Sequence, residues 1–185
     1  MSARNKRLRQ YLFIGSIILV IVSLIIIDNI KWTWQLQSDQ ETLNVIQEIY
    51  PVASYYYFDT NEIYKVYDNN KKNIGYAFYA EGVGEAIPRG EYGYKAANPI
   101  VILVGLKDQE TIKGIHVISQ GETWFFWNLL VQHNYFDQFN DLKIKDACFV
   151  DNGGSVDCVT MATMSSTSVL NIVRNAVSEK APLIN

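Results

Sequence analysis

Histidine and cysteine are scarce in this chain, whose 185 residues include two of each. His116 and His133 are widely spaced, and together with the two cysteines they match no ligand spacing typical of a zinc site. A Gly-x-Ser-x-Gly turn is also missing, and neither histidine has an evident nucleophile partner in the sequence. The sequence therefore gives little support to a metal centre or a hydrolase.

Basic residues are too few for a nucleic-acid-binding surface. The chain has 16 basic and 19 acidic residues, a net charge of −3. Arg4, Lys6, Arg7 and Arg9 all lie in the N-terminal tail, so the remainder is clearly acidic. Because no basic stripe is left, we expect no nucleic-acid partner.

Residues 11–27 form a long uncharged and almost wholly apolar run. At a rise of ~1.5 Å per residue they span about 25 Å, slightly less than a hydrocarbon core of about 30 Å. Flanking residues can complete the span, and Trp32 and Trp34 follow where amphipathic rings favour the interface. We expect a basic tail over 1–10, a transmembrane helix over 11–30 and a juxtamembrane linker over 31–37.

The alternative for this segment is a cleaved signal peptide. Such a peptide has a shorter apolar core and a small-residue cleavage site. The exit from the run, Asp28-Asn29-Ile30-Lys31, contains no such site, which favours an uncleaved anchor. The basic tail predicts a cytoplasmic N-terminus, a single pass through the cell (inner) membrane and an extracytoplasmic domain over 38–185.

The sequence of the domain predicts one helix, then a series of strands, then two further helices. A helix is predicted over 38–49, capped by Ser38 or Asp39 and stopped by Pro51. Runs rich in Tyr, Val and Ile predict an antiparallel meander, and a Gly- and Pro-rich loop covers 81–99. The fold class is therefore α+β, a twisted and mainly antiparallel sheet with helices packed on it. The predicted strands are 55–58, 63–67, 74–80, 99–106 and 112–118, and the later helices are 122–133 and 165–176.

Cys148 and Cys158 flank a turn signal, Asn152-Gly153-Gly154. An even number of cysteines outside the cytoplasm permits a disulfide across a hairpin. Two buried free thiols are an equally good interpretation, so the sequence leaves the pairing open.

The segment from Asp157 to Ser166 is the most informative in the chain. It is rich in Ser and Thr, and an amphipathic helix pattern follows it directly. Ser165 or Ser166 is expected as the N-cap, which places Thr163 just before a helix N-terminus, where an anion is favoured. Such stretches also precede helices simply as caps, so the pattern alone does not decide between the two roles.

The same segment resembles the covalent flavin-attachment motif of the FMN-binding domain family, which includes the flavin-carrying G subunit of Rnf complexes and the C subunit of sodium-pumping NADH:quinone reductase. The resemblance implies that Thr163 is joined through its hydroxyl oxygen to the phosphate of FMN. Met161 stands where the family usually has Gly. The matching motif residues are Asp157, Thr160, Ala162, Thr163 and Ser165, and Ser166 follows them.

A second stretch resembles the family more weakly. Ile112, Gly114, Ile115 and Val117 match a strand pattern that precedes a Glu-Thr pair, here Glu122 and Thr123. The resemblance implies that this pair bonds polar edges of the flavin, although a Thr-capped helix start is the alternative. The family then continues Pro-Gly-Leu-Gly, whereas this chain has Trp124-Phe125-Phe126-Trp127. These aromatics are expected in a core helix or in a patch facing the membrane or a partner.

Taken together, the resemblance implies a membrane-anchored electron-transfer subunit that carries FMN on Thr163. Its setting would be an Rnf/Nqr-type ion-translocating oxidoreductase complex, with other integral membrane subunits as partners and a flavin transferase for maturation. Asp157 is expected to serve mainly in recognition by that transferase. The alternatives are a scaffold or assembly subunit of the same fold without flavin, and a free-standing flavinylated carrier outside the cytoplasm.

Overall fold

The computed structural model describes residues 15–24, 36–83 and 99–184. The chain divides into two compact units, Met1–Gln37 and Ser38–Asn185. In the first unit residues 15–24 are helical. Among the described residues, no helix combines the length and the apolar character that crossing a membrane requires. The tail predicted over 1–10 and much of the anchor and linker predicted over 11–37 lie outside the described residues, as does most of the loop predicted over 81–99.

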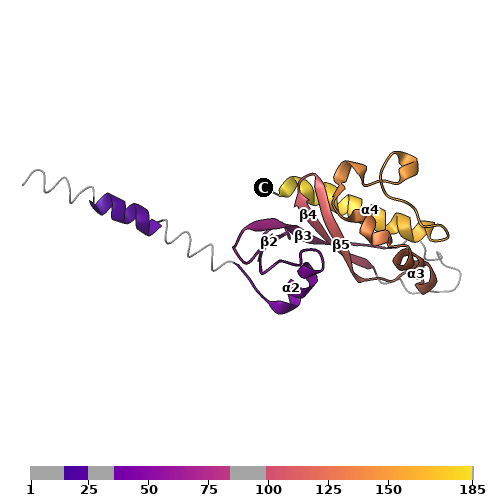
Figure 1. Ribbon diagram of the computed structural model, residues 1–185, viewed down its shortest axis with the longest axis horizontal. Coiled ribbons are helices and arrows are strands. Elements are labelled where there is room, and N and C mark those ends of the chain that lie inside the picture. Colours follow the sequence, from indigo (N-terminus) through magenta and orange to yellow (C-terminus); the bar gives the residue numbers. More distant parts are fainter. Residues whose placement is uncertain (1–14, 25–35, 84–98, 185) are drawn as a thin grey trace, which may run out of the picture. The chain divides into compact units, whose positions relative to one another are not determined.

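The second unit is built on a six-stranded sheet in which the strands follow one another in chain order (Figure 1). Every neighbouring pair is antiparallel. This meander confirms the α+β class expected from the sequence. The short last strand carries no pattern that the sequence analysis identified. The strands are β1 (Tyr55–Phe58), β2 (Tyr64–Tyr67), β3 (Asn73–Gly82), β4 (Ile100–Asp108), β5 (Thr111–Ser119) and β6 (Leu142–Lys143).

The central strand β4 is apolar on both faces, because helices cover the sheet on each side. Its alternate residues point in opposite directions. Leu103 joins the apolar cluster under α2 (Gln40–Gln47), whereas Ile102 and Val104 join the larger cluster under α4 (Thr163–Lys180). The continuous apolar run that marked this strand in the sequence thus reflects burial on two faces.

Helix α2 covers one face through Leu43 and Ile46. Asp39 caps it, and its carboxylate accepts a 3.0 Å hydrogen bond from the Thr42 amide. That bond holds the pKa of Asp39 below its ordinary value. Of the two capping residues expected from the sequence, Asp39 is therefore the one used.

Tyr50, which follows α2, joins the end of this helix to the sheet by hydrogen bonds. Its hydroxyl lies 2.8 Å from the Tyr76 carbonyl oxygen and 2.9 Å from that of Leu106. A Cβ at Gly75 would come within 2.6 Å of the Tyr50 ring, and one at Gly105 within 3.0 Å of its hydroxyl. The two glycines therefore open the space that the ring fills. Burial raises the pKa of Tyr50, so it remains a neutral donor.

Helix α4 covers the opposite face and is the longest described helix, with 18 residues. Its buried side chains include Val169, Leu170, Val173 and Val177, which pack on the larger apolar cluster. It begins two residues before the predicted start. The expected N-cap at Ser165 or Ser166 is wrong, because Ala162 holds that position and the hydroxyls of both serines bond elsewhere.

Helix α3 (Trp124–Gln132) lies beside the start of α4 and buries Leu130 in the same cluster (Figure 1). Thr123 occupies its N-cap position but makes no side-chain capping bond. The 3-10 helix η1 (Tyr135–Phe139) follows and buries Tyr135 and Phe139.

The chain between the two cysteines does not form a hairpin. Val150–Asn152 form a 3-10 helix, and Phe149 pairs with Val156 in an isolated parallel bridge. Cys148 and Cys158 are both free thiols. The turn predicted at Gly153 is confirmed, because this glycine adopts a left-handed conformation with φ of 81°.

We predict that Tyr50→Phe lowers the free energy of unfolding by about 1–2 kcal/mol, because it removes a buried hydroxyl that satisfies strand carbonyls. Urea denaturation of the full chain in detergent measures this. Tyr79→Phe is the matched control, since Tyr79 is 43% exposed and should lose much less. Equal losses in the two variants would contradict the locking role of Tyr50.

Candidate functional site

The segment that resembles an attachment motif turns sharply before it enters α4. The Ala162 amide donates a 3.0 Å hydrogen bond to the Val159 carbonyl, which closes a turn over Thr160 and Met161. Met161 has φ of 68°, in the left-handed region that favours glycine, and its side chain is 69% exposed. The backbone thus adopts a glycine-like conformation although the residue is Met.

Thr163 is the first residue of α4 and is exposed. The first helical hydrogen bond runs from the Ser166 amide to the Ala162 carbonyl, at 2.9 Å. The amides of residues 163–165 therefore precede the helical ladder, and the partial positive charge of the helix N-terminus is centred on them. An exposed hydroxyl at this position can carry an anionic group that faces these amides.

Glu122 and Ser165 meet directly beside this turn. Ser165 Oγ donates a 2.7 Å hydrogen bond to Glu122 Oε2, although the two residues lie 43 positions apart. Glu122 is only 7% exposed, and its other oxygen, Oε1, is buried without a hydrogen-bond partner in the described part of the chain. The pair joins the first turn of α4 to the residues that precede α3 and leaves one buried acceptor open.

The side-chain hydroxyl of Ser166 stabilises this turn through two hydrogen bonds. Its Oγ accepts from the Val159 amide at 3.2 Å and donates to the Ala162 carbonyl at 3.0 Å. Its own carbonyl accepts a 2.7 Å hydrogen bond from the hydroxyl of Tyr135, whose pKa is raised by burial and by nearby Cys158. Ser166 and Ala162 are both buried, so they shape the turn and present no group at the surface.

Asp157 and Thr160 face a different hollow. They line a cavity of about 550 Å³ together with residues from the end of α3 and from η1. The side-chain amide of Gln138 holds the Asp157 backbone, accepting from its N–H at 2.6 Å and donating to its carbonyl at 3.2 Å. The structure therefore brings Glu122 and Ser165 together beside Thr163, whereas Asp157 and Thr160 lie at the neighbouring cavity. The remaining lining residues are His133, Asn134, Asp137, Gln138, Cys158 and Val159.

A larger groove of about 760 Å³ runs between β3 and α4. Its polar lining on the helix includes Asn171, Asn175 and Glu179, and Tyr79 and Glu81 contribute from the strand. No motif in the sequence marked these residues. Their i, i+4, i+8 spacing along α4 is a signal that would have marked a polar helix face. A smaller cavity of about 360 Å³, lined in part by Arg174 and Ser178, lies on the same helix.

Comparison with known proteins identifies a family that matches part of the second unit. Residues 93–178 match the FMN-binding domain family. The chain is 34% identical over 96 residues to the G subunit of the ion-translocating oxidoreductase complex of Methanosarcina acetivorans. That alignment covers 51% of this chain and 50% of the relative, so the chain spans about half the length of this curated relative. The crystal structure of Shewanella oneidensis NqrC aligns with a TM-score of 0.47 and 18% identity, over 66% of this chain and 61% of that one.

The matched range takes in Glu122 and Thr123 as well as the whole segment from Asp157 to Ser166. The similarity to the FMN-binding domain family that the sequence motif indicated is thereby confirmed over residues 93–178.

Proposed function

We propose that this chain is a membrane-anchored electron-transfer subunit that carries FMN as a phosphoester on Thr163, within an Rnf/Nqr-type ion-translocating oxidoreductase complex. The observation that carries the proposal is the position of Thr163: an exposed hydroxyl on the first residue of an 18-residue helix, inside a range that matches the FMN-binding domain. In this proposal the predicted anchor over 11–30 places the domain on the outer face, and other integral membrane subunits are the partners.

The residues around Thr163 fit the phosphate end of a flavin nucleotide. A phosphoester on its oxygen retains one negative charge. The amides of residues 163–165, which donate no hydrogen bond within the helix, would stabilise that charge. The Ser165 side chain is held by Glu122, so the first turn of α4 is fixed before any anion arrives. The flavin, when bound, supplies the redox chemistry, and the protein supplies its position and its electrostatic surroundings.

Glu122 is proposed to accept a hydrogen bond from the cofactor. A buried acceptor without a partner is costly, at about 1–3 kcal/mol, and its Oε1 is such an atom among the described residues. A donor group on the polar edge of the flavin would satisfy it. Thr123 is exposed next to Glu122 and is proposed to offer its hydroxyl to the same edge.

Asp157 and Thr160 are proposed to act in recognition by the flavin transferase. Both are exposed and line the cavity of about 550 Å³, while the Asp157 backbone is held by Gln138. Because its backbone is held in place and its carboxylate is exposed, Asp157 is well placed for recognition by another protein. The exposed side chain of Met161 and its glycine-like backbone leave the turn itself in the conformation that a Gly would adopt.

Thr163→Ala should abolish covalent flavin, because no hydroxyl oxygen remains to bridge to the phosphate. Intact mass and visible absorbance after denaturation, on protein from the native host, measure this. Thr167→Ala is the control, since Thr167 lies one turn along α4 and its hydroxyl bonds the Thr163 carbonyl at 2.8 Å. An unmodified, colourless native protein would overturn the proposal and favour the scaffold subunit without flavin.

Asp157→Asn should reduce the fraction of chains that acquire FMN while leaving the fold intact, because it removes an exposed charge without touching the Gln138 contacts. The flavinylated fraction from mass spectrometry measures this. Asp137→Asn is the matched control, since Asp137 is exposed and lines the same cavity. Normal incorporation in Asp157→Asn would exclude the recognition role.

Glu122→Gln should raise the reduction potential of the bound flavin, because a nearby negative charge disfavours adding electrons and Gln retains an acceptor for Ser165. Spectroelectrochemical titration measures this. Glu110→Gln, a change in the exposed β4–β5 turn, should have no effect. Identical potentials in all three proteins would show that no charge on Glu122 acts on the flavin.

A further inference from the structure

The outward side of α3 carries no charged residue. Trp124, Asn128 and Val131 follow one another at helical spacing on that side, with Phe125 and Gln132 beside them. Trp124 is 73% exposed, and Phe125 and Val131 are half-exposed. The opposite side packs inward, with Leu130 fully buried and Phe126, Trp127 and Leu129 against the core. A helix on a water-facing surface normally carries charged side chains outward, and this one does not.

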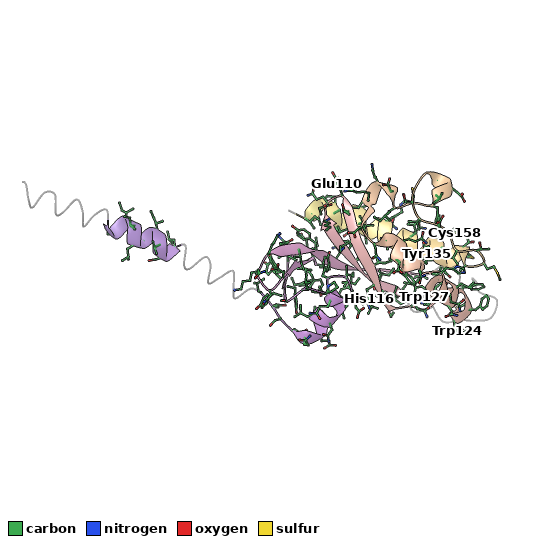
Figure 2. All side chains as sticks on the ribbon, viewed as in Figure 1. Glu110, His116, Trp124, Trp127, Tyr135 and Cys158 are labelled. Carbon is green, nitrogen blue, oxygen red and sulfur yellow. The ribbon has the colours of Figure 1, made fainter. Side chains whose placement is uncertain are left out.

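Two exposed methionines lie at and just before the start of the neighbouring helix α4. Met161 and Met164 flank Thr163 at the start of α4, and both are exposed. The hydrogen bond between Glu122 and Ser165 ties this turn to the residues that lead into α3. The start of α3 and the start of α4 therefore lie together, and in Figure 2 Trp124 stands at the border of the domain. We call Trp124, Phe125, Val131, Met161 and Met164 the aromatic-methionine patch.

We propose that this patch rests on the lipid surface of the membrane. The proposal concerns the stretch Trp124-Phe125-Phe126-Trp127 and the helix that it begins. It rests on the anchor that the proposed function includes, but not on the flavin linkage.

The chemistry of the patch favours lipid over a protein partner. Tryptophan and phenylalanine on an uncharged helix side are typical of side chains that enter the headgroup and acyl boundary. None of the three cavities described above is lined by a residue of the patch, so none of them would bind a side chain of another protein that contacts the patch. Within the described residues, α3 itself offers no charged side chain that would fix the orientation of a protein partner.

The length of the tether makes a modest patch sufficient. The predicted anchor ends at residue 30 and the second unit begins at Ser38, so seven residues separate them. Fully extended, they reach at most about 25 Å. A domain held that close meets the bilayer at a high effective concentration, so weak contacts hold its orientation. In Figure 1 both α2, where the second unit begins, and α3 lie along the lower border of that unit.

Depth-dependent quenching of a single tryptophan tests the proposal. The full chain with Trp32, Trp34 and Trp127 each changed to Phe keeps Trp124 alone, and Thr163→Ala removes any flavin that would absorb its emission. The protein is reconstituted into phosphatidylcholine vesicles with brominated acyl chains. We expect Trp124 emission to shift to the blue and to be strongly quenched relative to vesicles without bromine.

The control carries its tryptophan elsewhere on the domain. It combines Trp124→Phe with Glu110→Trp, placing the probe in the β4–β5 turn, which Figure 2 shows at the opposite border. Emission from this probe should be quenched by dissolved acrylamide and not by brominated lipid. Equal lipid quenching of both probes would overturn the proposal, because it would show no preferred face.

Three further outcomes would overturn it. Trp124 open to acrylamide and unaffected by brominated lipid would show that the patch faces water. Protection from both quenchers would show that protein covers it, either a second copy or a partner subunit. A chain that does not float with the vesicles would contradict the predicted membrane anchor as well as the patch proposal. Flavin attachment is measured separately on the chain with Thr163 intact, so its failure is distinguishable from each of these results.

Discussion

The packing of α4 on the sheet is the contact on which the candidate site depends. Val169, Leu170, Val173 and Val177 bury one side of the helix against the apolar face of β3 and β4. Burying side chains of this size contributes roughly 1.5–3 kcal/mol each, before the loss of conformational entropy. Because this contact fixes the helix axis, it also fixes where the helix N-terminus and Thr163 lie.

The first turn of α4 needs polar contacts in addition, because serines occupy its buried positions. Ser165 bonds Glu122, and Ser166 bonds the Val159 amide and the Ala162 carbonyl, with Tyr135 below. Together these bonds connect the helix start to the residues before α3, to the preceding turn and to η1. The same residues that resemble a flavin-attachment motif therefore also hold the turn together, which explains why a hydroxyl-rich stretch can be buried without loss of stability.

Local sequence patterns predicted most of the elements but not the details of the site. The strands β1 to β5 lie within two residues of the ranges predicted from Tyr-, Val- and Ile-rich runs, because burial and turn residues act locally there. The predicted start of α4 was wrong because the hydroxyl of Ser165 bonds the distant Glu122 and that of Ser166 bonds back to the preceding turn, so neither caps the helix. Glu122 is 43 residues from Ser165, and no spacing rule connects them. The strand β6 was missed because two residues carry too little pattern.

The chain order of the domain has a consequence for its biosynthesis. All six strands precede α4, so the sheet can pair strand by strand while the ribosome is still adding residues. The face that α4 covers stays open until that helix has emerged, and the turn at Thr160 and Met161 has no support from Glu122 or Tyr135 before then. The folded turn that carries Thr163 is thus a late product of synthesis, and the flavin attachment proposed above, if it requires that folded turn, would follow the completion of folding.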